Sequence, residues 1–456
     1  MHQLRDHSPA ARERAKRDRE DKRSIMPSIF ESHARNLRSA IDRARAAYIK
    51  KSRPPRLLTS HALFAHAFYN STHEDLIYFT SSPWDLLPIE LHIDIFSQCG
   101  LRDIYNLRLV SRAFRSIVSQ HEPAIVRGYL RHRRRGTLPQ PEIPVDMVHT
   151  REPEDDVVLL SDLFPPPRNR FGVSIFSFVY LQGLQRRQDT CGRLAGYLSE
   201  RVVDRYFQDE PAARRSFGNN RKDLRESTER AVRLLQFKLT PLMFYASFFL
   251  ETYAKLRLDH QNELLIVYDA GRLPVPMQPQ DRAAEYLRLQ IEILQTPPFT
   301  ITKNLISTHH VLHLLVSYLR RTISPEPPHD QNDDWISMLL YESGLARIVE
   351  FFAAEKGGGG VISGGVSQRA KRKEFMRNMQ EDWDRAKSNP GVDVVYGGGE
   401  EGTKPPKVGQ IWFKAAKGEM GKRGLVPHFS EDWVEVWGGR ISVGCENCVG
   451  EEGWLA

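Results

Sequence analysis

The feature that most constrains the fold is a run of apolar residues that repeats every three to four positions through the middle of the chain. Five segments between residues 171 and 353 show this spacing, which is typical of helices that bury one face. The sequence therefore predicts an all-α domain over residues 171–353. Prolines are expected to mark the boundaries between its helices; they are Pro241, Pro274, Pro276, Pro297, Pro298 and those of the stretch 324–330.

The positive charge of the chain is concentrated at its N-terminus. The formal net charge is +8, and residues 1–55 hold 15 Lys and Arg against 7 Asp and Glu. The rest of the chain holds 50 residues of each sign, which argues against nucleic acid as a partner of the folded part. Residues 1–55 are predicted to be a basic, largely disordered arm. A nuclear-import signal, a nucleic-acid arm and a membrane-surface helix are alternatives to a solvated tail.

Neither a membrane partner nor a secreted location is expected. The longest mostly apolar stretches, Val173–Leu184 and Leu242–Leu250, are shorter than the roughly 20 residues that span a bilayer. The N-terminus lacks the pattern of a secretory leader, and four cysteines are too few for a disulfide framework. These features predict a protein of the cytoplasm, the nucleus or both.

The C-terminal quarter changes character twice. Residues 354–402 are predicted to be glycine-rich linkers around a charged helix, in which Phe375, Met379 and Trp383 form a docking stripe. Residues 403–456 contain the β-favouring runs QIWFKA, WVEVW and RISVG. They predict a small β-containing element that packs on the helices. Its tryptophans are expected to fill that interface, with an exposed aromatic binding surface as the alternative; they are Trp412, Trp433, Trp437 and Trp454.

Candidate catalytic and metal-binding groups are sparse. The motif CENC at 445–448 lacks further ligands at zinc-site spacing, apart from His428. The cluster His309, His310 and His313 lacks a neighbouring carboxylate or cysteine and is interpreted as buried or half-exposed helix histidines. Acidic pairs at 155–156 and 333–334 are interpreted as helix caps. The sequence therefore predicts no catalytic site, no cofactor and no metal.

The segment LPIELHIDIFSQCG, residues 87–100, predicts a helix that is apolar over most of its circumference. At about 100° per residue, its apolar arc is about twice as wide as that of an ordinary surface helix. The polar sector holds Glu90, Asp94, Ser97 and Gln98, and His92 alone interrupts the apolar arc. We expect a second protein to cover part of this surface. The arc contains Leu87, Leu91, Ile95, Cys99, Ile89, Ile93 and Phe96.

Residues 100–118 predict two further short helices, with Ser111 as a cap between them. Three helices in about 45 residues form a core near the lower size limit for independent stability, so binding to a partner would stabilise them. The basic run 128–136 is interpreted as a helix C-terminus, where the helix dipole favours cations, in preference to a phosphate-binding site.

These residues resemble the F-box family. The stretch 87–118, LPIELHIDIFSQCGLRDIYNLRLVSRAFRSIV, has that family's Leu-Pro-x-Glu-Leu start, its Ile-Phe pair one turn on and its Leu-Arg-Leu-Val-Ser-Arg-x-Phe-Arg run. It departs from the pattern at Cys99, where a leucine is common, and at Gly100, where Asp is often seen. The smaller side chain at Cys99 puts the local packing in doubt. The resemblance covers residues 81–125 and places a three-helix F-box before the helical domain of a mainly α protein.

The resemblance also implies a function. F-box proteins dock the Skp linker protein of a cullin–RING ubiquitin ligase, so the chain is expected to be a non-catalytic adaptor that presents a substrate protein for ubiquitination. The layout is similar to that of many fungal F-box proteins. The residues of the second and third helices would divide between linker contact and the unit's own core. The expected linker-binding residues are Leu87, Pro88, Leu91, Ile95, Phe96, Leu101, Ile104, Leu107, Val110 and Phe114.

Two other functions stay open. A nucleic-acid-associated regulator would act through residues 1–55 and bind in a salt-dependent manner. A ligase-independent module would use the F-box to bind the linker protein without any ubiquitination. The substrate is not identified by the sequence, and it could bind the helical domain over 171–353, the tryptophan-rich end or both.

Overall fold

The structure, a computed structural model, is mainly helical, as predicted. It describes residues 84, 87–136, 153–209, 215, 220–271, 279–323, 333–355, 366–387, 405–425, 433–436 and 439–442. The basic arm and the CENC motif lie outside these residues. The helices are α3 (Ile89–Gln98), α4 (Leu101–Val110), α5 (Arg112–Gln120), α6 (Glu122–Gly136), α7 (Pro153–Leu163), α8 (Phe178–Asp209), α10 (Arg221–Asp269), α11 (Pro279–Leu294), α12 (Thr302–Ile323), α13 (Asp334–Met338), the π-helix η3 (Leu339–Ser343), α14 (Gly344–Glu355), α15 (Val366–Lys387), the 3₁₀-helix η5 (Val408–Gln410) and α18 (Phe413–Lys422).

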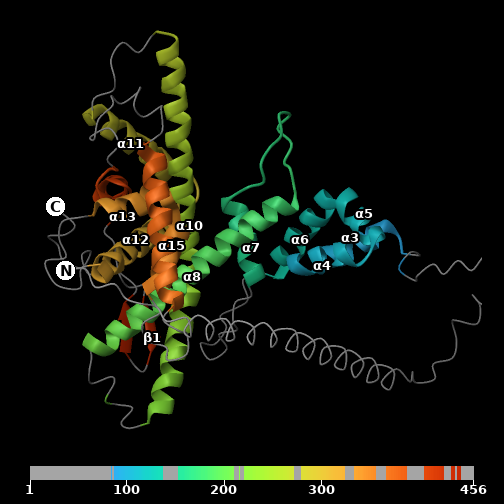
Figure 1. Ribbon diagram of the computed structural model, residues 1–456, viewed down its shortest axis with the longest axis horizontal. Helices are drawn as coiled ribbons and strands as arrows, with labels where there is room; N and C mark the ends of the chain where they lie inside the picture. Colours follow the sequence, from blue (N-terminus) through green and yellow to red (C-terminus); the bar gives the residue numbers. More distant parts are fainter. Residues whose placement is uncertain are drawn as a thin grey trace, which may run out of the picture. The chain divides into compact units, whose positions relative to one another are not determined.

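The long helix α10 is the centre of the helical body. Helices α8, α11, α12 and α14 pack against it, and Figure 1 shows α12 beside it. Its middle turns bury large apolar side chains such as Met243, Phe244 and Phe249. Helix α7 packs on α8, so the packed helices extend N-terminal to residue 171, where the sequence placed the start of this domain.

Pro241 lies inside α10 and does not end a helix, which corrects the boundary expected from the sequence. A proline in a helix interior removes one backbone hydrogen bond. The residues on both sides of it, Leu239 and Met243, are fully buried. Burial of this stretch against neighbouring helices offsets the lost bond, so tertiary packing overrides the local signal.

Trp412 occupies the core of the body. Its ring meets Phe249 edge-on, with centroids 4.6 Å apart, and Phe299 at 5.3 Å. Its Nε1–H donates a hydrogen bond to His309 Nδ1 at 3.2 Å. Trp412 therefore fills an interface between helices, as the preferred interpretation of the sequence had it.

The run QIWFKA, at 410–415, was expected to be β-favouring, and this prediction was wrong. Its residues end η5 and begin α18. The buried residues Ile411, Trp412, Ala415 and Ala416 recur at helical spacing on one face. Burial of that face against α11 and α12 decides the structure over the β-propensity of single residues.

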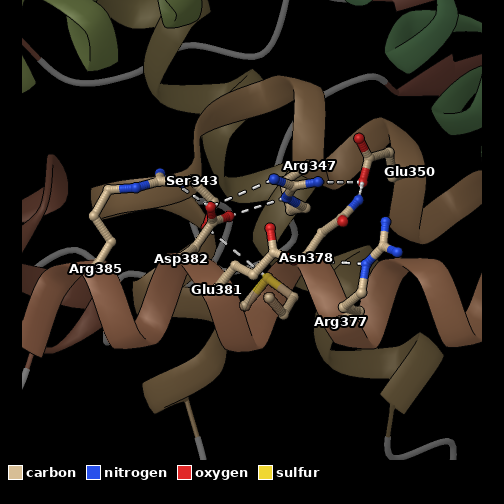
Figure 2. A network of polar contacts seen from close by, with 9 residues as sticks. Ser343, Arg347, Glu350, Arg377, Asn378, Glu381, Asp382 and Arg385 are labelled. Carbon is tan, nitrogen blue, oxygen red and sulfur yellow. Dashed lines mark hydrogen bonds and ion pairs between the residues drawn. The ribbon is translucent and has the colours of Figure 1, made fainter.

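Helix α15 docks on α14 through the stripe that the sequence identified. Phe375 is buried against Phe351, with ring centroids 5.5 Å apart. Beside it the buried carboxylate of Asp382 accepts a hydrogen bond from Arg347 Nε at 3.0 Å, and Arg347 also pairs with Glu350 at 2.5 Å. Figure 2 shows Arg347 reaching from α14 to Asp382 on α15. An apolar contact and a partly buried ion pair thus join the two helices.

Two short strands, β1 (Trp433–Val436) and β2 (Gly439–Ser442), form an antiparallel pair with Val434 opposite Ile441. The side chains of these strands and residues 443–456 are outside the described part. The aromatic surface expected at this end therefore stays a prediction.

The acidic residue at the start of α13 does not cap that helix. Asp333 stands at the N-cap of α13 but makes no side-chain cap bond; its carboxylate instead pairs with Arg320, with Nε 3.0 Å from Oδ1. The expected cap is therefore an interhelical ion pair.

None of the helices in the described part of the chain has the length and hydrophobicity of a membrane span.

Candidate functional site: an apolar face on helices α3 and α4

Helix α3 carries an exposed apolar strip. Leu91 is 48% exposed and Ile95, one turn later, is 39% exposed. Pro88, at the N-cap of the helix, is exposed, and Leu87 is half-buried. Leu91 and Ile95 are four residues apart and lie on one helical face. Together with Leu87 and Pro88, which directly precede the helix, they are called here the α3 strip.

The opposite side of α3 packs against α6 and is partly polar. Ser97 is buried, with its hydroxyl 2.7 Å from the Ile93 carbonyl oxygen and 3.2 Å from that of Ile125 on α6. Gly128 lies directly opposite: a Cβ added there would stand 2.3 Å from Ser97 Oγ. Ser97, which the sequence placed in a polar sector, therefore belongs to the interface between α3 and α6.

Arg133 on α6 holds the C-terminal end of α3. Its guanidinium donates to the carbonyl oxygen of Ser97 at 3.1 Å and to that of Cys99 at 3.5 Å, groups that a helix end leaves without intrahelical partners. It also lies over the ring of Tyr129, 3.4 Å from the centroid. The basic run 128–136 is thus the C-terminal part of α6, as predicted, and it has a structural role that the sequence did not show.

Cys99, the position where the sequence departs from the F-box pattern, is half-buried. Partial burial, together with the nearby carboxylate of Asp103, raises the pKa of its thiol, so the group stays protonated at neutral pH. Its Sγ–H donates to the Ile95 carbonyl oxygen at 3.3 Å. Cys99 therefore completes the last turn of α3 as a small neutral side chain.

Helices α4 and α5 close the core of this unit. Leu101 and Ile104 are buried, and Phe114 meets the fully buried Phe96 edge-on with ring centroids 6.0 Å apart. The Ser111 hydroxyl accepts a hydrogen bond from the Phe114 amide at 3.0 Å, which confirms the predicted cap of α5.

The C-terminal turn of α4 adds a second apolar surface. Leu109 is 86% exposed and Val110 is 70% exposed, while Leu107 is half-buried. We call Leu109 and Val110 the α4 edge. The sequence singled out Val110 and Leu107 but not Leu109. A helical projection of residues 101–110 could have found Leu109, since it lies about 140° from the buried Ile104.

The ten residues predicted to bind a linker protein therefore fall into two groups. The side chains of Phe96, Leu101 and Ile104 are buried, and Phe114 packs on Phe96. Phe96, Leu101 and Ile104 form the core of the unit, whereas Phe114 is half-buried and keeps some accessible surface. Phe96 is fully buried in the isolated chain, and its contact with a linker protein stays a prediction. The others keep accessible surface on the α3 strip and at the end of α4.

Contacts with the start of α8 connect this unit to the body. The Phe178 amide, at the N-terminus of α8, donates a hydrogen bond to Glu122 Oε1 on α6. The Phe178 ring lies 6.1 Å from that of Tyr105 on α4, and the Arg127 guanidinium lies 5.8 Å from the centroid of the Phe176 ring. Helix α6 thus contacts both α3 and the beginning of the body.

The histidine cluster of α12 is part of the hydrophobic core. His309 and His310 are buried and His313 is half-buried, as interpreted from the sequence. The ring centroids of His309 and His313 lie 4.6 Å apart, and the Phe413 ring lies tilted against that of His313 with centroids 4.1 Å apart. Burial, reinforced by the neighbouring histidines and Lys417, holds the pKa of His309 well below its usual value. Within the described part of the chain, no group of three or more His, Cys, Asp or Glu side chains is placed to hold a metal ion.

The comparison with protein families identifies the unit formed by α3, α4 and α5. Residues 84–125 match the family model of the F-box domain. No curated protein and no solved structure matches the chain. The match spans the α3 strip, the α4 edge and the buried residues between them, and it ends within α6. This chain therefore carries an F-box domain at residues 84–125.

Proposed function

We propose that this protein is the substrate-recruiting subunit of a Skp–cullin–F-box ubiquitin ligase. F-box domains are generally found in non-catalytic adaptors of such ligases, and the match at residues 84–125 supports that general role. The observation that carries the proposal is the apolar surface that this domain leaves open. Leu91, Ile95, Leu109 and Val110 are all exposed, although each would favour burial by about 1.5–3 kcal/mol if fully covered.

In this proposal a Skp-type linker protein covers the α3 strip and the α4 edge. Large exposed side chains of this kind act as anchors when a partner buries them. The residues Phe96, Leu101 and Ile104 shape the surface from beneath. Helix α6 also contributes, because its Gly128 and Arg133 pack on and hydrogen-bond to the end of α3 around Ser97 and so fix the orientation of α3.

The ligase would then act by proximity. A substrate bound to the helical body is held near the ubiquitin-conjugating enzyme that the cullin–RING assembly carries. Holding both reactants in one complex raises their effective concentration without any catalytic side chain in this chain. This account requires the linker surface on the F-box and a substrate surface elsewhere on the chain.

Capture of purified Skp linker protein tests the proposal. The double variant Leu91→Glu/Ile95→Glu places two charges on the α3 strip and is expected to abolish capture, because an unpaired charge would be buried in the complex. The matched control is Leu258→Glu/Ile266→Glu, two exposed apolar residues of α10, and it is expected to capture linker normally. If both double variants capture linker as the wild type does, the proposal is wrong.

The alternative of a ligase-independent module makes a different prediction. With linker, cullin and RING protein present, the wild type would bind the linker but would change the ubiquitination of no cellular protein. Ubiquitin-remnant profiling of cells with the wild type and with the Leu91→Glu/Ile95→Glu variant separates the two. The proposal expects a set of sites that depends on the α3 strip.

A further inference from the structure

A cavity in the helical body, remote in sequence from the F-box, has the properties of a binding site. Its volume is about 650 Å³, within the range of pockets that hold a small ligand or a few side chains. Helices α10, α11, η5 and α18 contribute to its walls. The residues that line it are Tyr253, Gln280, Arg282, Ala283, Ala284, Tyr286, Leu287, Asp334, Pro405, Pro406, Lys407, Gln410 and Lys414.

The base of the cavity contains an unused hydrogen-bond donor. Tyr253 is only 1% exposed, and its hydroxyl has no hydrogen-bond partner among the described residues. Burial raises the pKa of this hydroxyl to about 12, against the opposing effects of Arg257 and the neighbouring Gln290 side chain, so it keeps its proton and can donate. Leaving a buried polar group without a partner is costly. A ligand with an acceptor atom at this point would remove that cost.

Buried side chains around Arg257 hold the ring of Tyr253 in place. The guanidinium of the buried Arg257 lies 3.3 Å from the centroid of the Tyr341 ring and 5.3 Å from that of Tyr253. Arg257 also pairs with Glu342 at 3.0 Å and donates to the Tyr341 carbonyl oxygen at 2.6 Å. Because these contacts already hold the Tyr253 ring, ligand binding loses less side-chain conformational entropy.

The charge around the cavity selects for anions. Three cationic side chains line it, Arg282, Lys407 and Lys414, against one acidic side chain, Asp334. The two lysines and Asp334 are exposed, whereas Tyr253 and Tyr286 are buried. The cavity therefore combines positive groups near solvent with aromatic walls and a neutral donor deeper inside.

We propose that this cavity is the substrate-binding site and takes an anionic side chain of a polypeptide, a carboxylate or a phosphate group. The inference rests on the proposed function, in which the helical body holds a substrate protein. The anion pairs with Lys407 and Lys414. An oxygen atom of the bound segment accepts a hydrogen bond from the Tyr253 hydroxyl. An apolar neighbour of the anion packs on Tyr286 and Leu287.

Binding of labelled peptide mixtures to the full chain, in complex with the linker protein, tests this site. The mixtures have random sequence around a fixed central residue, which is Glu, phosphoserine or Gln. We expect the Glu or the phosphoserine mixture to bind at least about tenfold more tightly than the Gln mixture, and the stronger of the two identifies the anion. Equal binding of all three mixtures would overturn the proposal.

Variants of the lining residues locate the binding. Lys407→Glu/Lys414→Glu is expected to remove the preference for anionic peptides, whereas Lys422→Glu, an exposed lysine of α18 that does not line the cavity, is expected to keep it. Tyr253→Phe removes only the hydroxyl and is expected to weaken binding several-fold while the melting temperature stays equal or rises. Unchanged binding in both lining variants, or equal loss in the Lys422→Glu control, would contradict the assignment.

Two further measurements distinguish the peptide-binding cavity from RNA binding and from the proposed ligase function. A labelled single-stranded RNA serves as a competing probe, and binding of RNA without binding of anionic peptides would overturn the proposal. Linker capture is measured in the same preparations. Failure of the wild type to capture linker would count against the ligase function, whereas loss of anion preference with capture intact in the wild type counts against the cavity alone.

Discussion

Helices α3 and α14 have comparable apolar content but differ in how much of it they bury. Helix α14 buries its large apolar side chains, including Ile348 and Phe352. Helix α3 exposes Leu91 and Ile95 and buries polar Ser97 against α6. Apolar burial is the main source of stability, so α14 serves the fold. In α3 the same kind of residue is exposed, which the proposed function explains by a partner that covers it, and polar contacts together with the close approach of Gly128 help to hold the helix against α6.

The largest expected difference in stability between the two helices follows from removal of a buried ring. Phe352→Ala on α14 is expected to lower the free energy of unfolding by about 3–5 kcal/mol, since the fully buried ring leaves a cavity. Leu91→Ala on α3 is expected to change it by no more than about 0.5 kcal/mol. Urea unfolding of both variants measures the difference. Similar losses in the two would mean that Leu91 belongs to the core.

The ion pair between α14 and α15 offers a second test. Among the described residues, Arg347→Met leaves the buried carboxylate of Asp382 paired with the exposed Arg385, at 3.3 Å, and is expected to cost about 3 kcal/mol. The exposed pair Arg377–Glu381, at 3.6 Å, is the control, and Arg377→Met is expected to cost less than about 1 kcal/mol. Thermal unfolding of the two variants compares them; equal shifts would contradict the distinction between buried and exposed pairs.

Overpacking at the α3–α6 contact should have an intermediate effect. Gly128→Ala introduces a Cβ 2.3 Å from Ser97 Oγ and is expected to destabilise the F-box by about 1–3 kcal/mol. The control Gly418→Ala in α18, where a Cβ meets nothing within 4 Å, is expected to stabilise by about 0.5–1 kcal/mol. Hydrogen exchange of α3 amides measures the first effect, and recovery by Ser97→Gly in the same chain would confirm its cause.

The smallest effect concerns pH. His309 accepts a hydrogen bond from Trp412 through Nδ1 and its pKa is lowered by burial, so the folded protein holds it neutral. Unfolding frees it to bind a proton at about its ordinary pKa of 6.5. Stability should therefore fall as the pH drops below about 6.5, by up to about 1.4 kcal/mol per pH unit. His309→Gln is expected to flatten this slope, and an unchanged slope would show that another group is responsible.

The sequence predicted the parts of the molecule that local patterns determine. The helical class, the cap at Ser111, the docking stripe around Phe375 and the F-box helices all follow from spacing and residue type. The predictions failed where contacts between distant residues decide. The helix that begins at Phe413 forms because Trp412 packs in a core with Phe249 and Phe299. Helix α10 continues through Pro241 because the residues on both sides of the proline are buried.

The candidate site was predicted in the same uneven way. The pattern located Leu91 and Ile95 on an apolar arc, but it could not separate them from Phe96, which packs on Phe114. Nor could it assign Ser97 and Arg133, because their roles depend on α6, which extends beyond the region of family resemblance. The cavity around Tyr253 brings together four segments spread over about 160 residues, a proximity that no local pattern encodes.

The most direct test of the central claim measures linker affinity and stability on the same single variants. Leu91→Ala is expected to weaken binding of the Skp linker protein by about 30-fold or more, as loss of an anchor does, with almost no change in the free energy of unfolding. Ile104→Ala, beneath the surface, is expected to lose about 2–5 kcal/mol of stability. Isothermal titration and urea unfolding give both quantities. A Leu91→Ala variant that binds the linker with wild-type affinity would contradict the account.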